Sequence, residues 1–249
     1  MSAATTVATG LPARGQVRLH VLAEPAWLTT STEQCFTPWL SEEEQERWQR
    51  FRHEADRQRF LLARALTRSV LANCLQQKPE SLQFIRNSHG KPELVQSAAT
   101  PEQRLKFNVS HTQGMVVLAV TMADEVGVDV EAVTRDAEML ALAERFFAES
   151  ETALLRAAVP SQMRDLFFRL WTLKEAYVKA RGLGLQLGLD SFAFGMDAAL
   201  TPSLLRAEVD DVTRWSCFSL TYAESFRIAV AVASPTAALE LESVDVLQL

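Results

Sequence analysis

One order of elements occurs in each half of this 249-residue chain: a helical segment and then a short antiparallel hairpin. In the first half, apolar residues at helical spacing run from about 41 to 75, and the β-rich runs 105–109 and 115–121 flank a turn at 111–114. In the second half, helices over about 136–158 and 163–181 precede apolar runs at 215–221 and 226–233. The repeat predicts an α+β fold, a pseudo-dimer of two similar halves, each a small, mainly antiparallel sheet packed with helices around a shared crevice. Two unrelated α+β lobes would give the same pattern.

Local signals set the limits of the predicted elements. Ser41 precedes three glutamates, which is typical of a helix start, because a serine hydroxyl can cap the first backbone N–H groups. Gly182 predicts the end of the last helix. We expect further strands at 17–22, 81–86, 126–133 and 191–194, and a turn at 87–92. The expected division is a flexible tail at 1–16, an N-terminal half at 17–125 and a C-terminal half at 126–249.

Composition excludes several classes of protein. Apolar residues make up 48% of the chain and the net charge is −6, so it is neither a disordered chain nor a typical nucleic-acid binder. The three cysteines are far apart in the sequence, which argues against a disulfide framework or a zinc site. No apolar stretch approaches the ~20 residues of a membrane helix, and the first sixteen residues are unlike a signal peptide. We therefore expect a cytoplasmic protein with no nucleic-acid or membrane partner.

The segment GVDVE at 127–131 is the first candidate for chemistry. On a strand, Asp129 and Glu131 point to the same face, and two adjacent carboxylates repel each other unless a cation relieves the repulsion. Mg²⁺ takes its ligands from one or two carboxylates, waters and phosphate oxygens. An alternating edge strand with a solvated polar face would account equally for the pattern.

The second candidate is the helical segment WTLKEAYVKARGLG at 171–184. Glu175 and Lys179 are four residues apart and so share one face of the helix. They could form an ordinary surface ion pair. They could also supply a further carboxylate for a metal or a proton acceptor, with a phosphate contact beside it.

Two further segments and a basic helix are candidates for binding an anion. Adjacent residues of an extended chain point to opposite faces, so Ser110 and His111 in FNVSH (107–111) do not suit a nucleophile and its base. Both suit phosphate binding, and a turn cap with an exposed histidine would account equally for them. Lys91 lies in GKP (90–92), which is either a simple turn or an anion contact. The first long helix carries a cluster of arginines interleaved with glutamates, which is either a solvated face or a landing site for a polyanion: Arg47, Arg50, Arg52, Arg57 and Arg59.

Together, these four segments resemble the 4'-phosphopantetheinyl transferases of the large, surfactin-synthetase-type class. The family pattern is G-K-P, [FW]-N-[ILV]-S-H, G-[IV]-D-[IV]-E and W-[ST]-x-K-E-[AS]-x-x-K-x-x-G-x-G. This chain has these motifs, in that order, at 90–92, 107–111, 127–131 and 171–184, within a resemblance that covers about residues 41–194. One departure is the acidic run at 42–44, where several relatives are more basic.

The resemblance implies a monomeric pseudo-dimer and a reaction. Coenzyme A would donate its 4'-phosphopantetheine arm to a serine hydroxyl of an apo acyl or peptidyl carrier protein, with release of adenosine 3',5'-bisphosphate. Three carboxylates would hold Mg²⁺, or Mn²⁺ in its place: Asp129, Glu131 and Glu175. The expected catalytic residues are Asp129, Glu175 as the base for the incoming serine, and Lys179 on the pyrophosphate. The residues expected to bind coenzyme A are Arg47, Arg59, Lys91, Ser110, His111 and Lys179.

The carrier protein would need a docking surface of its own. Carrier proteins are usually acidic, so we expect an apolar surface with a basic rim, for which the candidates are Met139, Leu142, Phe146 and Phe147, residues that could equally be core. Two other functions fit parts of the pattern. A non-catalytic module that binds a carrier protein or coenzyme A should have lost at least one of the carboxylates or Lys179, and all are present. A Mg²⁺-dependent phosphoryl transferase on an unrelated fold would be expected to carry a phosphate-binding loop of another type.

Overall fold

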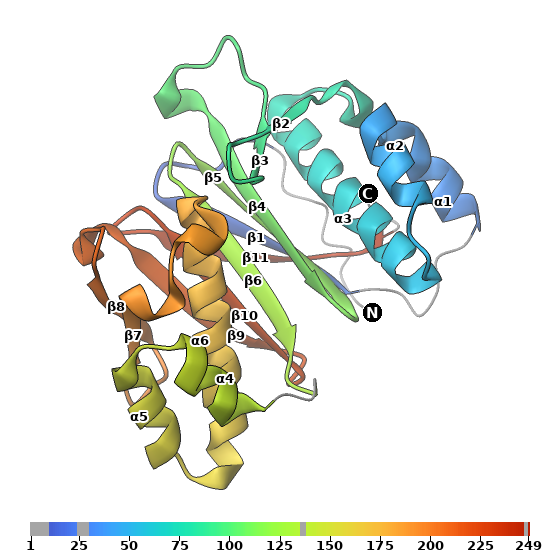
Figure 1. Ribbon diagram of the computed structural model, residues 1–249. Helices are drawn as coiled ribbons and strands as arrows, with labels where there is room; N and C mark the ends of the chain where they lie inside the picture. Colours follow the sequence, from blue (N-terminus) through green and yellow to red (C-terminus); the bar gives the residue numbers. More distant parts are fainter. Residues whose placement is uncertain (1–9, 24–29, 135–137, 247–248) are drawn as a thin grey trace, which may run out of the picture.

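Two sheets lie face to face between two groups of helices (Figure 1). The protein is described from a computed structural model, which covers residues 10–23, 30–134, 138–246 and 249. The first sheet has the order β11 (Ala238–Val244), β1 (Gln16–Ala23), β5 (Met115–Met122), β4 (Leu105–Thr112). The second sheet has the order β6 (Val126–Ala132), β10 (Phe226–Val232), β9 (Ser216–Tyr222). Alternate apolar side chains of both sheets form one core between them, as expected for half-buried strands.

Helices cover the outer face of the first sheet. The 22-residue α3 (Glu54–Leu75) packs its apolar side on β4 and β5, and α1 (Thr30–Phe36) and α2 (Glu42–Gln49) lie beside it. Ser41 caps α2 as the sequence predicts: its hydroxyl accepts from the N–H of Glu44, and the Glu44 carboxylate accepts from the N–H of Ser41. A small hairpin, β2 (Phe84–Arg86) and β3 (Pro92–Leu94), follows α3.

The second sheet is covered in the same way. The 22-residue α6 (Pro160–Arg181) packs on β6 and β10, with α4 (Met139–Phe146) and α5 (Glu149–Ala157) beside it. Gly182 ends α6 in a left-handed conformation, with φ of 64°. A hairpin of β7 (Phe192–Met196) and β8 (Pro202–Ala207) follows α6, as β2 and β3 follow α3. The predicted α+β pseudo-dimer of two similar halves is therefore confirmed.

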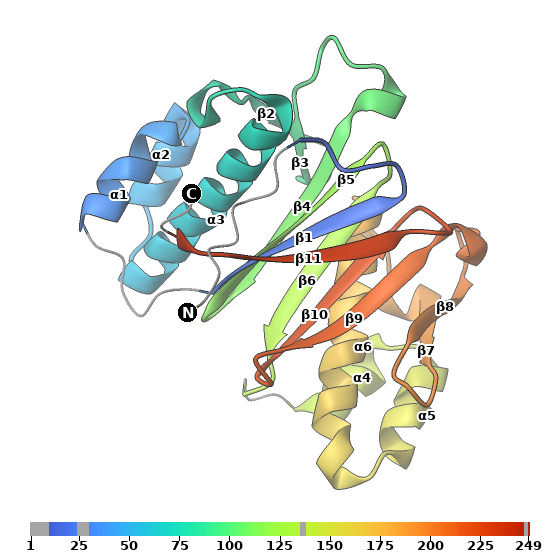
Figure 2. The same cartoon turned by 180° about the vertical axis from the view of Figure 1, so that it is seen from behind.

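The helical pattern over 41–75, which allowed an interruption, has one: α2 ends at Gln49 and α3 begins at Glu54, and the ring of Phe51 between them contacts that of Phe60. The structure differs from the sequence expectations at two places. The helix expected over 136–158 is broken by Phe147, whose extended backbone lets its buried ring stack on Phe167. The last strand, β11, crosses back and pairs in parallel with β1, so residues 238–244 lie with the first half rather than with 126–249 (Figure 2).

The helices of the described residues are too short or too polar to cross a membrane. The expected tail at 1–16 lies largely outside the described residues, which begin at residue 10.

Candidate active site

The site forms where α6 approaches β6 most closely. A Cβ atom on Gly127 would lie 2.0 Å from the carbonyl oxygen of Ala176 and 2.4 Å from the nitrogen of Ala180, distances that no side chain can occupy. Only glycine therefore permits this contact between strand and helix backbones. The close approach brings Lys179 of α6 beside Asp129 of β6.

Asp129 joins three of the sequence motifs. It is 5% exposed, and its Oδ1 atom accepts a hydrogen bond from the Lys179 ammonium at 2.6 Å and another from the Ser110 hydroxyl at 2.9 Å. Lys179 also donates to the Ser110 hydroxyl oxygen at 2.9 Å. Ser110 lies on β4, so this three-residue network connects the two halves of the molecule.

The second oxygen of Asp129 is the feature that points to a metal ion. Among the described residues, Oδ2 is buried and has no hydrogen-bond partner, an arrangement that is costly for a carboxylate. Burial and, second, the negative charge of Asp129 raise the pKa of Glu175, while Lys179 acts in the opposite direction. A divalent cation between the two carboxylates would give the Asp129 Oδ2 atom a partner and would offset the repulsion between Asp129 and Glu175. These residues therefore fit the expected metal.

The third expected ligand, Glu131, is turned toward a neighbouring cavity. Within the described part of the chain, no group of three or more histidine, cysteine, aspartate or glutamate side chains is already assembled for a metal ion. Of the three carboxylates expected to hold the metal, Asp129 and Glu175 thus lie together. Glu131 lies two residues further along the same face of β6.

Two cavities lie beside the site, one lined by Glu175 and Lys179 and the other by Glu131. The larger one, about 570 Å³, has Glu175 and Lys179 in its wall, and its other side chains are mostly apolar, with contributions from Val109, Phe146, Val178, Leu187 and Leu189. The smaller one, about 470 Å³, is polar and is lined by Arg59, His111, Thr112, Gln113, Glu131, Ala132 and Thr134. Ser110 and His111 are adjacent in sequence but have different surroundings. Ser110 contacts Asp129, whereas His111 lines the smaller cavity with Arg59.

The two remaining residues expected to bind coenzyme A have contacts of another kind. The guanidinium of Arg47, an exposed residue of α2, lies over the ring of Phe60, and Arg47 is not among the described residues that line either cavity. Lys91 belongs to the wall of the larger cavity, but its ammonium donates to three acceptors of the protein: Glu125, Val126 and Ala180.

The candidate docking residues on α4 separate into core and surface. Phe147 is 5% exposed and belongs to the core of the second half, so it is not available for docking. Met139 and Leu142 are half-buried against the same core. Phe146 lines the larger cavity, with the Arg145 guanidinium over its ring.

Sequence reasoning missed two buried polar residues near the site. The side-chain oxygen of Asn108 accepts from the N–H of Val128 at 2.9 Å, which joins β4 to β6. Lys174, which precedes Glu175, is fully buried and pairs with the fully buried Glu151 at 2.6 Å. The signal for Lys174 was its position: it shares a helix face with the apolar residues Leu170 and Tyr177, where a charge needs a buried partner.

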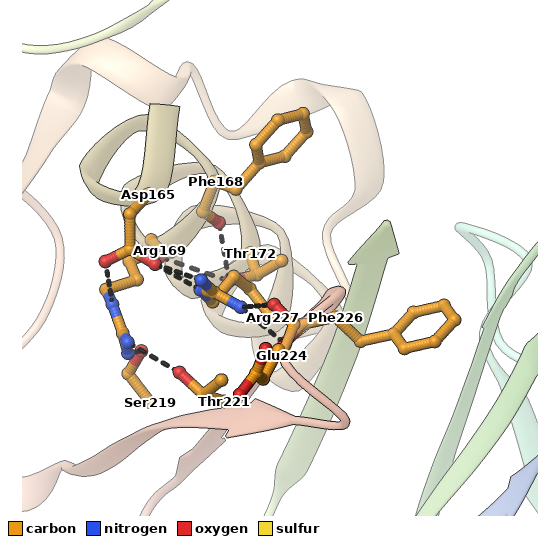
Figure 3. Close-up of polar contacts among 9 residues, drawn as sticks. All are labelled: Asp165, Phe168, Arg169, Thr172, Ser219, Thr221, Glu224, Phe226 and Arg227. Atoms are coloured by element: carbon orange, nitrogen blue, oxygen red, sulfur yellow. Dashed lines mark hydrogen bonds and ion pairs between the residues drawn. The ribbon is translucent and has the colours of Figure 1, made fainter. Parts of the chain in front are cut away.

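A second ionic cluster fixes the earlier turns of α6 (Figure 3). Asp165 accepts from the Nε atom of Arg169 at 2.7 Å and also pairs with Arg227 of β10. Arg169 donates in turn to the hydroxyls of Ser219 and Thr221 on β9. Arg227 is directly opposite Glu131 in the register of β6 and β10, so this cluster lies beside the carboxylate strand.

Comparison with known proteins identifies the class of protein that carries such a site. Residues 26–123 match the family model described as 4'-phosphopantetheinyl transferase, N-terminal, and residues 125–231 match that of the 4'-phosphopantetheinyl transferase superfamily. The chain is 35% identical over 215 residues to the 4'-phosphopantetheinyl transferase HetI of Nostoc sp., covering 86% of this chain and 87% of that protein. It is 31% identical over 210 residues to Sfp of Bacillus subtilis, covering 84% and 88%. The crystal structure of Thermotoga maritima holo-[acyl-carrier-protein] synthase matches 44% of this chain and 62% of that chain, at 27% identity and a TM-score of 0.36.

The chain therefore belongs to the 4'-phosphopantetheinyl transferase family, in the large class that includes Sfp and HetI. It is an enzyme, and the group that it transfers is phosphopantetheine.

Proposed function

We propose that this enzyme transfers the 4'-phosphopantetheine arm of coenzyme A to a serine hydroxyl of an apo acyl or peptidyl carrier protein. The reaction depends on Mg²⁺ and releases adenosine 3',5'-bisphosphate. The observation that carries the proposal is the buried, unbonded Oδ2 atom of Asp129 beside Glu175 and Lys179. These groups lie next to a cavity large enough for a phosphorylated ligand.

Three carboxylates are assigned to the metal in this proposal. Asp129 and Glu175 form its centre, and Glu131 completes it from the same face of β6. Mg²⁺ fits this set better than a softer metal does, because every donor is a carboxylate oxygen; Mn²⁺ can use the same ligands. When bound, the ion supplies positive charge that offsets the charge of the pyrophosphate.

The remaining steps belong to the side chains of the protein. Glu175, directly or through one water molecule, takes the proton of the carrier serine hydroxyl. Its carboxylate lines the larger cavity, where an incoming hydroxyl can reach it. The serine oxygen then forms a bond to the phosphorus that bears the pantetheine arm. The bond from that phosphorus to the bridging oxygen breaks, and adenosine 3',5'-bisphosphate leaves with the electron pair.

Lys179 is assigned to the leaving group. Its side chain is 29% exposed at the wall of the larger cavity, so its ammonium can exchange the long 3.4 Å contact with the carbonyl of Val128 for a pyrophosphate oxygen while it remains beside Asp129. Developing negative charge in a partly buried site is stabilised by donors that are already oriented. The protein itself needs no nucleophile, because the carrier serine fills that role.

The two cavities suggest how the substrates divide between them. Arg59 and His111 give the smaller cavity the donors that suit the phosphorylated nucleoside end of coenzyme A, with Ser110 at its junction with the site. The apolar walls of the larger cavity suit the pantetheine arm. Phe146 and Arg145 at this cavity provide an apolar contact and a positive charge for an acidic carrier protein.

Mass spectrometry of intact carrier proteins tests this function. A panel of apo acyl and peptidyl carrier proteins is incubated with the enzyme, coenzyme A and Mg²⁺, and with EDTA in a parallel series. We expect at least one carrier to gain the mass of one phosphopantetheine arm, and this gain should be absent with EDTA or when the carrier serine is replaced by alanine. No gain on any carrier with metal present would contradict the proposal.

Two variants separate the site from its surroundings. Asp129→Asn should lower the rate of arm transfer by about a hundred- to a thousandfold, because it removes the negative charge that holds Lys179 and that is assigned to the metal. Asp124→Asn is the matched control, since Asp124 lies in the turn before β6 and is not among the described residues that line the two cavities. It should transfer the arm at close to the wild-type rate.

A further inference from the structure

A single ammonium group joins the two elements that carry the candidate catalytic residues. Lys91 lies at the end of the turn between β2 and β3, in the first half. Its Nζ atom donates to the carboxylate of Glu125 at 3.1 Å, to the carbonyl of Val126 at 3.2 Å and to the carbonyl of Ala180 at 3.0 Å. A lysine ammonium has three N–H donors, so these three acceptors use all of them.

Both carbonyl acceptors are next to the site. Val126 is the first residue of β6, on the same strand as Asp129. Ala180 follows Lys179 in the last turn of α6, where the unpaired carbonyls of a helix favour a cation. Lys91 therefore connects the start of the strand to the end of the helix at the place where Gly127 brings them together.

The turn around Lys91 also fits against the residues that end α6. The side-chain amide of Asn87 donates to the carbonyl of Gly182 at 3.2 Å. A Cβ atom on Gly182 would lie 3.1 Å from that amide nitrogen and 3.2 Å from the Lys91 side chain. Gly184 lies beside His89, at an ordinary contact distance of 3.8 Å from its Cβ position to the His89 carbonyl oxygen. The G-K-P motif and the G-x-G that ends the helical motif are thus two sides of one contact between the halves.

Lys91 is poorly placed to leave these partners for a ligand. Its side chain is only 11% exposed. Burial lowers the pKa of Lys91, and the charge of Glu125 acts in the opposite direction. A ligand phosphate would have to replace three hydrogen bonds, one of them to a carboxylate.

We propose that Lys91 is a positioning residue: its ammonium holds the end of α6 on the start of β6 and so keeps Glu175 and Lys179 aligned with Asp129. It acts through these residues and is not a contact for coenzyme A, the role that the sequence resemblance implies. The inference rests on the proposed function of the site. It explains why a lysine of the first half belongs to the same motif set as the carboxylates of the second.

The test separates alignment from ligand binding. Lys91→Met is compared with Lys106→Met, because Lys106 contacts the other oxygen of the same Glu125 carboxylate, at 2.6 Å, without the contacts to Val126 and Ala180. For each variant we would measure kcat and KM for coenzyme A in arm transfer. The Kd for adenosine 3',5'-bisphosphate would be measured by calorimetry, a readout that needs no turnover.

For Lys91→Met we expect kcat to fall about ten- to a hundredfold, as small misplacements of catalytic groups do. The Kd and KM should stay within about twofold of wild type, and Lys106→Met should keep its kcat. Lys91→Arg retains the cation, but no single nitrogen of a planar guanidinium can donate to three acceptors. It should show an intermediate kcat with unchanged Kd, and it provides the test if Lys91→Met does not fold.

Two results would overturn the inference. One is a Kd at least tenfold weaker in Lys91→Met with kcat unchanged, which is the signature of a coenzyme contact. The other is a Lys91→Met enzyme as active as Lys106→Met. Wild-type arm transfer is measured in the same series, so failure of the proposed function would be seen as an inactive wild type and would be distinguishable from both results.

Discussion

Arg68 in the first half and Lys174 in the second half have the same kinds of contacts. Arg68 of α3 donates to the carbonyls of Pro79 and Leu82 after its helix and to the carboxylate of Glu44 before it. Lys174 of α6 donates to the carbonyls of Leu189 and Phe192 after its helix and pairs with Glu151 before it. Each cation also lies over a phenylalanine ring at the start of the hairpin that follows, Phe84 or Phe192. The two halves thus share a buried cation that fixes the long helix to its flanking segments.

The halves differ one residue further along. Glu175 follows Lys174 and faces Asp129, whereas Ser69 follows Arg68 and its hydroxyl contacts the carbonyl of Leu249. The second half also has Gly127, which lets α6 touch β6 at the backbone. The lysine of the W-T-L-K-E segment therefore belongs to the scaffold, and the chemistry depends on the close contact between α6 and β6 in the second half.

The largest expected effect on turnover comes from removing that close contact. Gly127→Ala places a methyl group 2.0 Å from the backbone of α6, so the helix must move away from β6. We expect a loss of about 3 kcal/mol in the free energy of unfolding and a fall in turnover of at least about a hundredfold, measured by denaturant titration and by arm transfer. Gly10→Ala is the control, because nothing lies within 4 Å of its Cβ position and only its positive φ is strained. It should cost about 1 kcal/mol and leave turnover unchanged; equal turnover in both variants would contradict the comparison.

The buried cations at equivalent positions of the two halves, Arg68 and Lys174, give the next test. Lys174→Met leaves the fully buried Glu151 carboxyl without its cation, so we expect a loss of about 3–5 kcal/mol in the free energy of unfolding. Adding Glu151→Gln should recover part of this loss, because it removes the unpaired charge. Arg68→Met in the first half should cost less, since its partner Glu44 retains 14% exposure. Thermal unfolding of the three variants measures these differences. A larger loss in the free energy of unfolding for Arg68→Met than for Lys174→Met would contradict the expected order.

The smallest effect is expected at Asp165, which is 30% exposed. Although burial acts to raise it, hydrogen bonds from Arg169 and Arg227 hold the pKa of Asp165 below its ordinary value. Asp165→Asn should cost on the order of 2 kcal/mol near neutral pH, less than a fully buried pair would. The sign follows from the lowered pKa: the stabilisation is complete above pH ~4–5 and disappears as the pH falls through the folded-state pKa. Unfolding free energies of both proteins between pH 3 and pH 7 should therefore converge at the acidic end, and a constant difference would exclude the ionic cause.

Local signals explain which parts of the fold could be predicted from the sequence. The cap at Ser41, the hairpin of β4 and β5 and the stop at Gly182 depend on neighbouring residues, and the structure has all three. The return of β11 to β1 depends on a pairing between residues at opposite ends of the chain, which no local pattern indicates. The break at Phe147 has the same origin, because its stacking partner Phe167 belongs to a later helix.

The candidate site was predictable to the same extent. Strand alternation places Asp129 and Glu131 on one face, and helical spacing places Glu175 near Lys179. The meeting of Asp129 with Lys179 follows from Gly127, whose role is visible only when the helix is docked. The partners of Lys91 lie at residues 125, 126 and 180, so sequence spacing alone could not distinguish a ligand contact from a link between the halves.

Manganese binding followed by electron paramagnetic resonance, in the presence of coenzyme A, tests the central claim most directly. We expect one Mn²⁺ ion per wild-type chain, and at least about tenfold weaker binding in Asp129→Asn and in Glu175→Gln. Asp124→Asn should bind the ion as wild type does. Unchanged stoichiometry and affinity in Asp129→Asn would contradict the assignment of the metal to this pair of carboxylates.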